Sequence, residues 1–481
     1  MVNLVCPLLL ILIYHKVGRS SDALIYLEKY LEICEASFHK NHANNIPNLI
    51  NYAKVLQVTG KCKKALKVYN RAIKIHQLNF KEGQNANQLE TLKFEYNLLK
   101  DFLGISDRPH RRGSASSIRS LPSIVEIPEI VIEGTGTPII ILTDIGRDID
   151  DELSMVLLAS LKRMGLLNPI AIVTTLAPQC DRAKLLRGSL DALGMVNIPV
   201  GIGSSGGVAI GEKLEYYGGE YAKKNCEIYE NGLKLMINAL KAAPRKSVQF
   251  LCIASFTDAA SLIEEDEELF FDKVKEVIIM GGVEKLESSE FLQPDTAYNN
   301  NCDMPAARFV YQRCQELGIP TITVSRWAAY GSSVSTNLLD ELARTEHMVA
   351  CNIRNVSESN LMKLWKKVNF PLDDPRREKL PERCDREWFC RTFTSKYTIS
   401  DDESVWGQVT KVNLYDPLAL LACVPAFREL HFDWKTKVID NTPHIVTGIS
   451  NEDKGIIDAS ALNDELFSLL RLSLQASLEM I

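Results

Sequence analysis

The sequence lacks the features that define several classes of protein. It has no C-x-x-C pair and no compact cysteine framework, although twelve cysteines are scattered from Cys6 to Cys423. Disulfide scaffolds and structural zinc sites are therefore disfavoured, and free thiols in a reducing, cytoplasmic compartment are expected. It has no excess of positive charge, since the formal net charge is −6. This balance argues against a partner made of nucleic acid.

The sequence also lacks an apolar run long enough to cross a membrane. The candidate, "LVCPLLLILIY" (Leu4–Tyr14), falls short of the about 20 residues that a spanning helix needs. It has no basic residues before it and no clear cleavage site, so it does not resemble a signal peptide. We therefore predict no association with a membrane.

What the first part of the sequence contains is a repeated helical pattern over residues 1–104. Aligning "VGRSSDALIYLEKYLEICEASF" with "TGKCKKALKVYNRAIKIHQLNF" pairs Gly18 with Gly60, a period of 42 residues, and pairs Phe38 with Phe80. Such a period is typical of stacked helical hairpins. The segment resembles the tetratricopeptide repeats of the kinesin-light-chain type, which implies a protein or peptide partner; a generic helical bundle is the alternative. In this register Leu4–Tyr14 contributes to the first helix.

Residues 105–135 differ in composition from both flanks. They are rich in serine and arginine and are interrupted by Pro109 and Pro122, with few residues that could pack into a core. We interpret this stretch as a flexible linker.

From residue 136 to 481, short apolar runs alternate with amphipathic helical patterns. Near-continuous Val/Ile runs separated by helices predict an α/β domain, a mostly parallel, open, Rossmann-like sheet with helices on both faces. Ligands bind beyond the carboxyl ends of the strands in such sheets. The predicted strands are Pro138–Thr143, Pro169–Thr175, Ile198–Gly203, Val248–Ser255, Val274–Gly282 and Ile319–Ser325.

Four aspartates crowd the turn after the first predicted strand, in "IIILTDIGRDIDDELSM". Asp144 follows the strand directly, and Asp150 and Asp151 precede the next helix. Carboxylates packed so closely would repel one another unless a divalent cation lay between them. Oxygen ligands favour calcium or magnesium over zinc. Acids at a helix N-terminus are an alternative explanation for Asp150 and Asp151, but not for Asp144.

Later motifs follow in a characteristic order. They are "ASFTDAA", "MGGVE", "DTAYNNNCDMPAARFV" and "YDPLALLACV". Together with the acidic turn, they resemble the inosine–uridine nucleoside hydrolase family from about Thr137 to the C-terminus. The first motif of that family reads D-x-D-P-G-x-D-D-A, and its last reads H-D-P-L-A.

The resemblance implies roles for individual residues. Asp144 would bind the metal and act as general base, Asp151 would be the bidentate ligand, and Asp416 would be the ligand from the last motif. The backbone carbonyl of Thr257 would complete the calcium site, and Asp150 would bind the hydroxyls of the sugar.

Further residues would contact the substrate. Asn299 would bind the sugar, and so would Gln179. Asn300, Asn301 or Asp295 could compensate for the sugar-capping glutamate, which Ala297 replaces. Tyr415 stands where some members have a histidine that protonates the leaving base, and its side-chain pKa near 10 makes it a weaker acid.

Two insertions set this sequence apart from the family pattern. Arg147 and Asp148 lengthen the acidic turn by two residues, although Asp148 could instead be aligned with a motif aspartate. A long insertion lies near residues 355–408, where Trp388 and Phe389 could stack on a base or cover the pocket. A core role for both aromatic residues is the alternative.

These features predict calcium-dependent hydrolysis of the N-glycosidic bond of a ribonucleoside or related riboside, giving free base and ribose. The alternative is a ribose- or nucleoside-binding signalling module that has lost turnover, with the repeats as its protein-interaction scaffold. A metal-dependent phosphatase is disfavoured, because Gly146 stands where its second aspartate would lie. The resemblance also implies a homo-oligomer, since family members are usually dimers or tetramers.

Overall fold

The computed structural model covers the chain in two parts. It describes residues 61–79 and scattered positions between 46 and 100, and then residues 135–479 apart from short gaps. The gaps are residues 208–213, 223–226, 287–288, 378–379, 381, 395, 397 and 400–403. The predicted helix at Leu4–Tyr14, the first copy of the repeat and nearly all of the predicted linker lie outside the described residues.

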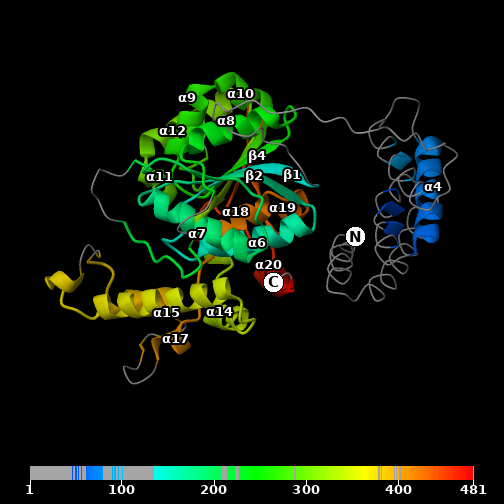
Figure 1. Ribbon diagram of the computed structural model, residues 1–481. Coiled ribbons are helices and arrows are strands. Elements are labelled where there is room, and N and C mark those ends of the chain that lie inside the picture. The colour runs from blue at the N-terminus through cyan, green and yellow to red at the C-terminus, as the bar shows by residue number, and fades with distance from the viewer. Residues whose placement is uncertain are drawn as a thin grey trace, which may run out of the picture. The chain divides into compact units, whose positions relative to one another are not determined.

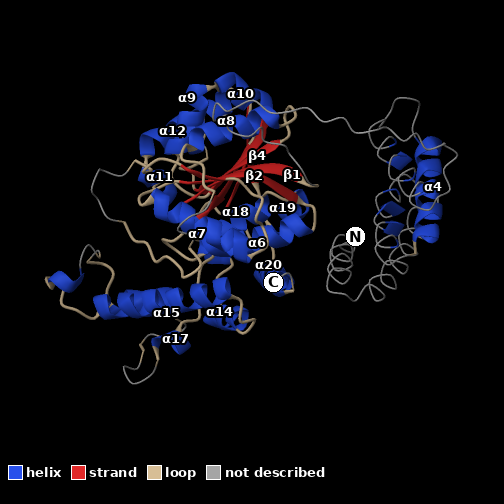
Figure 2. Cartoon of the chain, in the orientation of Figure 1, coloured by secondary structure: helices blue, strands red, loops and turns tan. Residues whose placement is uncertain are grey.

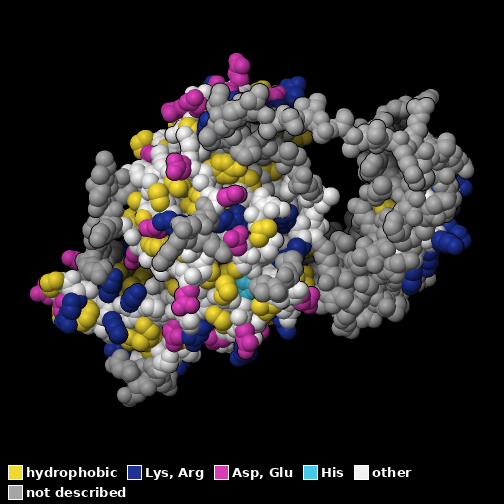
Figure 3. All heavy atoms as spheres, viewed as in Figure 1, with side chains coloured by type: hydrophobic (Ala, Val, Ile, Leu, Met, Phe, Trp, Pro, Cys, Tyr) yellow, Lys and Arg dark blue, Asp and Glu magenta, His cyan; other side chains and the backbone are white. Residues whose placement is uncertain are grey.

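The chain divides into two compact units, Met1–Glu126 and Ile127–Ile481. In the first unit, helix α4 (Cys62–Asn79) coincides with the second copy of the predicted repeat. Its buried side chains recur every three or four residues, which places them on one face of the helix. That face includes Tyr69 and packs with Leu49 and Leu56 in a small apolar core. The helix contains lysine and arginine but no acidic residue, and basic side chains cluster over it (Figure 3).

The second unit is built on an eight-stranded sheet with the order β3-β2-β1-β4-β5-β6-β8-β7 (Figures 1 and 2). All neighbouring strands are parallel except β7 and β8. The central strands are buried, as their Val/Ile runs predict: β4 over its whole length, and β1 in all but its first two residues. The strands are β1 (Thr137–Thr143), β2 (Leu167–Thr174), β3 (Val200–Ile202), β4 (Val248–Cys252), β5 (Val274–Gly281), β6 (Thr321–Ser325), β7 (Lys435–Ile439) and β8 (Thr442–Thr447).

Helices cover both faces of this sheet (Figure 1). One layer consists of α8 (Gly232–Ala242), α9 (Thr257–Glu265), α10 (Glu267–Lys273) and α12 (Met304–Glu316). The other consists of α6 (Asp150–Arg163), α7 (Gln179–Ala192), α18 (Asp416–Ala422), α19 (Pro425–His431) and α20 (Ala459–Leu478). Short helices α11 (Tyr298–Cys302) and α13 (Arg326–Gly331) follow β5 and β6.

The long insertion forms a helical lobe with its own apolar cluster. It contains α15 (Met348–Val368), α16 (Arg386–Phe393) and α17 (Val405–Gln408), and α14 (Thr336–Ala343) precedes it. Trp365 and Phe389 lie in this cluster with ring centroids 5.0 Å apart. The lobe therefore has a core separate from the layers around the sheet.

All six predicted strands are present, and the predicted α/β class is confirmed. The β7–β8 hairpin was not predicted from the sequence, because its strands are half exposed and lack a continuous apolar run. Among the described helices, none is long and apolar enough to span a membrane.

Candidate active site

The acidic turn lies at the carboxyl end of β1 and leads into α6. Gly146 adopts a φ of +97°, and a Cβ there would lie 2.8 Å from the ring of Tyr216, so this position requires glycine. The hydroxyl of Thr143 donates to Asp151 Oδ1 at 2.5 Å, and the backbone N–H of Asp144 donates to the same oxygen at 3.2 Å. The turn thus folds back on the first residues of α6.

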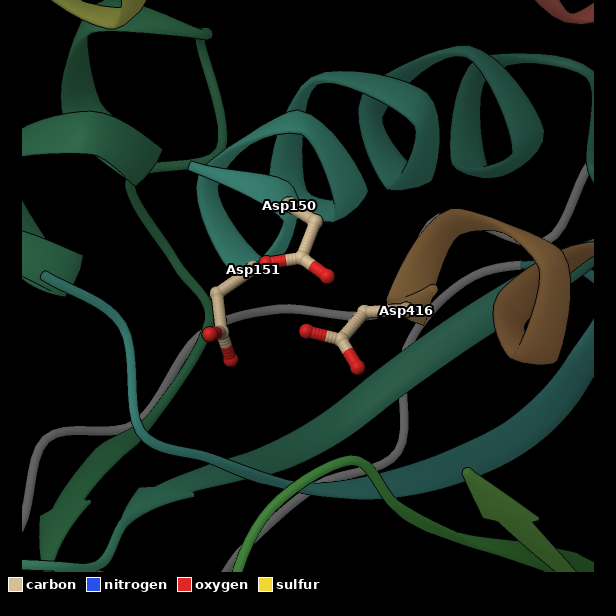
Figure 4. A group of neighbouring side chains, drawn as sticks. All are labelled: Asp150, Asp151 and Asp416. Atoms are coloured by element: carbon tan, nitrogen blue, oxygen red, sulfur yellow. The ribbon is translucent and has the colours of Figure 1, made fainter. Parts of the chain in front are cut away.

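Three carboxylates converge from two helices. Asp150 and Asp151 begin α6, and Asp416 begins α18 after the "YDP" motif. Their side chains point toward one another (Figure 4), and one oxygen of each lies within 4.8 Å of the others. Each is at most 6% exposed. This cluster can hold a metal ion.

Burial makes this group of acids electrostatically unfavourable without a cation. Burial raises the pKa of Asp144 to about 6, although the guanidinium groups of Arg182 and Arg147 oppose the shift. Burial and the neighbouring Asp148 raise the pKa of Asp150 to about 7. The pKa values of Asp151 and Asp416 are raised well above the usual range by burial first and by the other carboxylates second. A divalent cation would remove this penalty.

The carboxylates line a cavity of about 260 Å³ at the carboxyl ends of the central strands. Residues from the ends of β1, β4, β5 and β6 contribute to its walls, as expected for the ligand crevice of an open α/β sheet. The lining residues are Asp144, Arg147, Asp148, Asp150, Asp151, Ile253, Met280, Gly281, Ala297, Tyr298, Asn299, Arg326, Tyr330, Tyr415 and Asp416.

Six residues that were expected to bind the metal or the substrate line this cavity, and Arg147 and Asp148 of the two-residue insertion line it too. Besides the four aspartates at positions 144, 150, 151 and 416, Asn299 and Tyr415 line it. The amide of Asn299 donates to the carbonyl of Met280 at 3.0 Å, which fixes its orientation at the end of β5. The geometry groups Asp150 with Asp151 and Asp416 as potential metal ligands, whereas the resemblance implied a sugar contact for Asp150.

Four other candidates do not line the cavity, and each makes a different contact. The carbonyl of Gln179 accepts a hydrogen bond from Thr174. The hydroxyl of Thr257 donates to Asp303 at 2.7 Å, and Ile253 is the nearby residue that lines the cavity. Asn300 is fully buried, with its amide donating to Gly282 and Asp295, and Trp388 packs edge-on against Phe393 in the insertion lobe.

Two arginines and two tyrosines in the wall were not predicted. The guanidinium of Arg147 lies 3.6 Å from the ring centroid of Tyr298 and pairs with Asp148 at 2.9 Å. Arg326 pairs with Asp295 at 2.6 Å. Arg326 directly follows β6, so its position after a predicted strand could have identified it. The fourth residue, Tyr330, comes from α13 and has no comparable signal in the sequence.

The chain belongs to the inosine-uridine preferring nucleoside hydrolase family, whose sequence pattern matches residues 139–454. A second pattern, that of the tetratricopeptide repeat, matches residues 4–77 and confirms the predicted class of the N-terminal part. No curated protein matches the chain.

Solved structures of two effector proteins are similar to the second unit. The type III effector protein XopQ, complexed with adenosine diphosphate ribose, is 28% identical with a TM-score of 0.62. The alignment covers 71% of this chain and 95% of that one. The effector protein XOO4466 is also 28% identical, with a TM-score of 0.61, and the alignment covers 71% and 94% of the two chains.

Proposed function

We propose that this protein hydrolyses the N-glycosidic bond of a riboside and depends on a calcium ion. The observation that carries the proposal is the convergence of three buried carboxylates, next to Asp144, on a cavity of ligand size. Nucleoside hydrolase family membership supports the same reaction class.

The donor set fits a hard divalent cation. The three clustered carboxylates, Asp150, Asp151 and Asp416, offer oxygen ligands only. Among the residues that the structure describes, no histidine or cysteine lines this cavity. Oxygen-only sets of this kind favour calcium or magnesium. When bound, the cation would lower the pKa of a water molecule and hold the hydroxyls of the sugar.

Each residue of the cavity would then have a separate role in the reaction. Asp144, whose pKa is raised, would accept the proton of the attacking water. Asn299 would hold the sugar, and the neighbouring carboxylates would stabilise the positive charge that develops on the ribosyl ring. Burial raises the pKa of Tyr415 further, so it would donate a hydrogen bond to the leaving base rather than transfer a proton readily.

The two arginines in the wall favour a ligand that carries phosphate. Arg147 and Arg326 bring two guanidinium groups to the wall, where Arg147 pairs with Asp148 and Arg326 pairs with Asp295. Guanidinium groups recognise phosphate through charge-assisted hydrogen bonds. The adenosine diphosphate ribose in the XopQ complex is a ligand of this chemistry. We propose a phosphorylated riboside, with adenosine diphosphate ribose as the first probe.

A second candidate function is ribose or nucleotide binding without turnover, with the repeats as a scaffold for a protein partner. Two observations favour it. The residue directly before Asp416 is Tyr415 and not the histidine of some family members, and the tetratricopeptide pattern matches residues 4–77. The absence of a good proton donor near the leaving base would slow the reaction without preventing binding.

The test is to incubate the protein with calcium and nucleosides, nucleoside monophosphates or adenosine diphosphate ribose, and to measure free base by chromatography. We expect base release by the wild type, with a drop of at least about a hundredfold in D144N and D416N. The control is D181N, which changes a surface aspartate paired with Lys184 outside the cavity. Calorimetric binding without base release would favour the second candidate, and no binding by any probe would overturn both.

A further inference from the structure

Glu152 is a buried carboxylate that the proposed reaction does not use. It follows Asp151 directly, at the position where the family motif D-D-A has an alanine, and it is fully buried in the first turn of α6. A buried carboxylate is costly unless its oxygens are hydrogen-bonded. A small apolar residue at this position would avoid that cost. The hydrogen bonds of Glu152 therefore show what the carboxylate contributes in its place.

Three hydroxyl groups satisfy the oxygens of Glu152. Ser189 donates to Oε1 at 2.7 Å and Tyr221 donates to the same oxygen at 2.5 Å, while Tyr217 donates to Oε2 at 2.9 Å. Ser189 lies on α7, and both tyrosines lie on residues 214–222, which we call the tyrosine segment. Glu152 therefore fixes the start of α6 to two other parts of the fold.

The tyrosine segment also holds the acidic turn through the backbone. The N–H of Tyr217 donates to the carbonyl of Gly146 at 2.8 Å. The buried guanidinium of Arg182 donates to the carbonyls of Asp144, at 2.5 Å, and Glu215, at 3.1 Å. The tyrosine segment therefore holds the acidic turn at Gly146 and holds the start of α6 at Glu152.

The same network reaches the helix that opens the insertion. The amide of Asn352, on α15, donates to the hydroxyl oxygen of Tyr221 at 3.0 Å and to the carbonyl of Gly218 at 3.2 Å. The Tyr221 hydroxyl can accept this bond while it donates to Glu152. An unbroken chain of hydrogen bonds therefore runs from α15 to the residue next to Asp151.

We propose that Glu152 is a positioning residue for the cation site and that the hydroxyls of Tyr217 and Tyr221 set its orientation. The bonds to Glu152 fix the rotation and axial position of the first turn of α6. Asp150 and Asp151 occupy that turn, so its position decides whether their oxygens meet those of Asp416. Supporting groups of this kind tune metal affinity although they touch no metal. This inference rests on the cation site of the proposed function.

The test measures calcium affinity, not activity. We expect Y217F and Y221F, which each remove one hydroxyl and keep the ring, to bind calcium about tenfold more weakly than the wild type by calorimetry. The double variant should be weaker than either. The control is Y216F on the same segment, whose hydroxyl donates to the carbonyl of Asp181 and not to Glu152; its affinity should be unchanged.

Thermal unfolding in calcium-free buffer separates positioning from a general loss of stability. A purely structural role would lower the unfolding temperature and leave the calcium affinity, measured well below that temperature, unchanged. That result, or equal affinities in Y221F, Y217F and Y216F, would overturn the inference. If the wild type itself bound no calcium, the cation of the proposed function would fail first and this inference with it.

Discussion

At the scale of single residues, Arg182 shows how much the candidate site depends on a side chain outside it. Its guanidinium is fully buried and donates to five backbone carbonyls, those of Asp144, Ile145, Leu176, Ala177 and Glu215. It joins the acidic turn, the β2–α7 connection and the tyrosine segment. The sequence indicated the four aspartates from their spacing, but nothing local distinguished Arg182 from a surface arginine on α7.

We predict that R182M lowers the stability of the protein by at least about 3 kcal/mol, because five buried carbonyls lose their donor. Differential scanning calorimetry should show a fall of about 5 °C or more in the unfolding temperature. The control is K184M, a surface change on the same helix, with an expected effect within about 0.5 kcal/mol. Equal unfolding temperatures for the two variants would show that the carbonyls find other donors.

At the scale of elements, the insertion lobe combines a separate core with a connection to the site. Its cluster of Trp365, Phe389 and Phe393 lies apart from the sheet, whereas Asn352 on α15 takes part in the network around Glu152. The sequence located the insertion by a departure from the family motifs. Of the two aromatic residues for which the sequence allows either a base contact or a core role, Phe389 is a core residue.

We predict that F389A unfolds the lobe locally by removing about 3–5 kcal/mol of packing. Phe389 is fully buried, and its ring centroid lies 4.9 Å from that of Phe393. Removal of the Phe389 ring would therefore leave a cavity in the core of the lobe. Hydrogen exchange read by mass spectrometry should show faster exchange in residues 348–412 and unchanged protection in β1 and β2. The exposed Phe271 on α10 provides the control, F271A, for which no change in either region is expected. Faster exchange throughout the sheet would contradict a separate core.

At the scale of the whole molecule, a nucleoside hydrolase unit follows a tetratricopeptide part in one chain. The second unit carries an unfavourable concentration of buried negative charge, and this charge links its global stability to pH and to cations. Raised carboxyl pKa values mean that the native state binds protons more tightly than the unfolded state.

We predict that calcium stabilises the protein more at about pH 8 than at about pH 5.5. The pKa of Asp144 is raised from 3.8 to about 6 and that of Asp150 to about 7. Without a cation, the stability from these protonated groups is fully present below the ordinary pKa of 3.8, declines as pH rises, and is lost once pH has passed the raised values of about 6 and about 7. Calcium would compensate for that loss and would compete with protons at lower pH.

The measurement is the calcium-induced rise in unfolding temperature of cation-stripped protein at the two pH values. In D416N, which lacks one of the three clustered carboxylates, the rise should be small at both. An equal rise at the two pH values in the wild type would contradict the linkage between these acids and the cation.

The sequence by itself determined the α/β class, the six parallel strands and the turn that carries Asp144, Asp150 and Asp151, because these follow from local periodicity and spacing. The family resemblance added Asp416 to the same site. Only the tertiary structure decided which arginines lie beside these acids and how Glu152 is held. Those relations depend on the order of strands in the sheet, which brings β1, β4, β5 and β6 to one crevice although long stretches of chain separate them. Tyr330 and Asn352 reach the site region through that arrangement, so their positions along the chain do not reveal it.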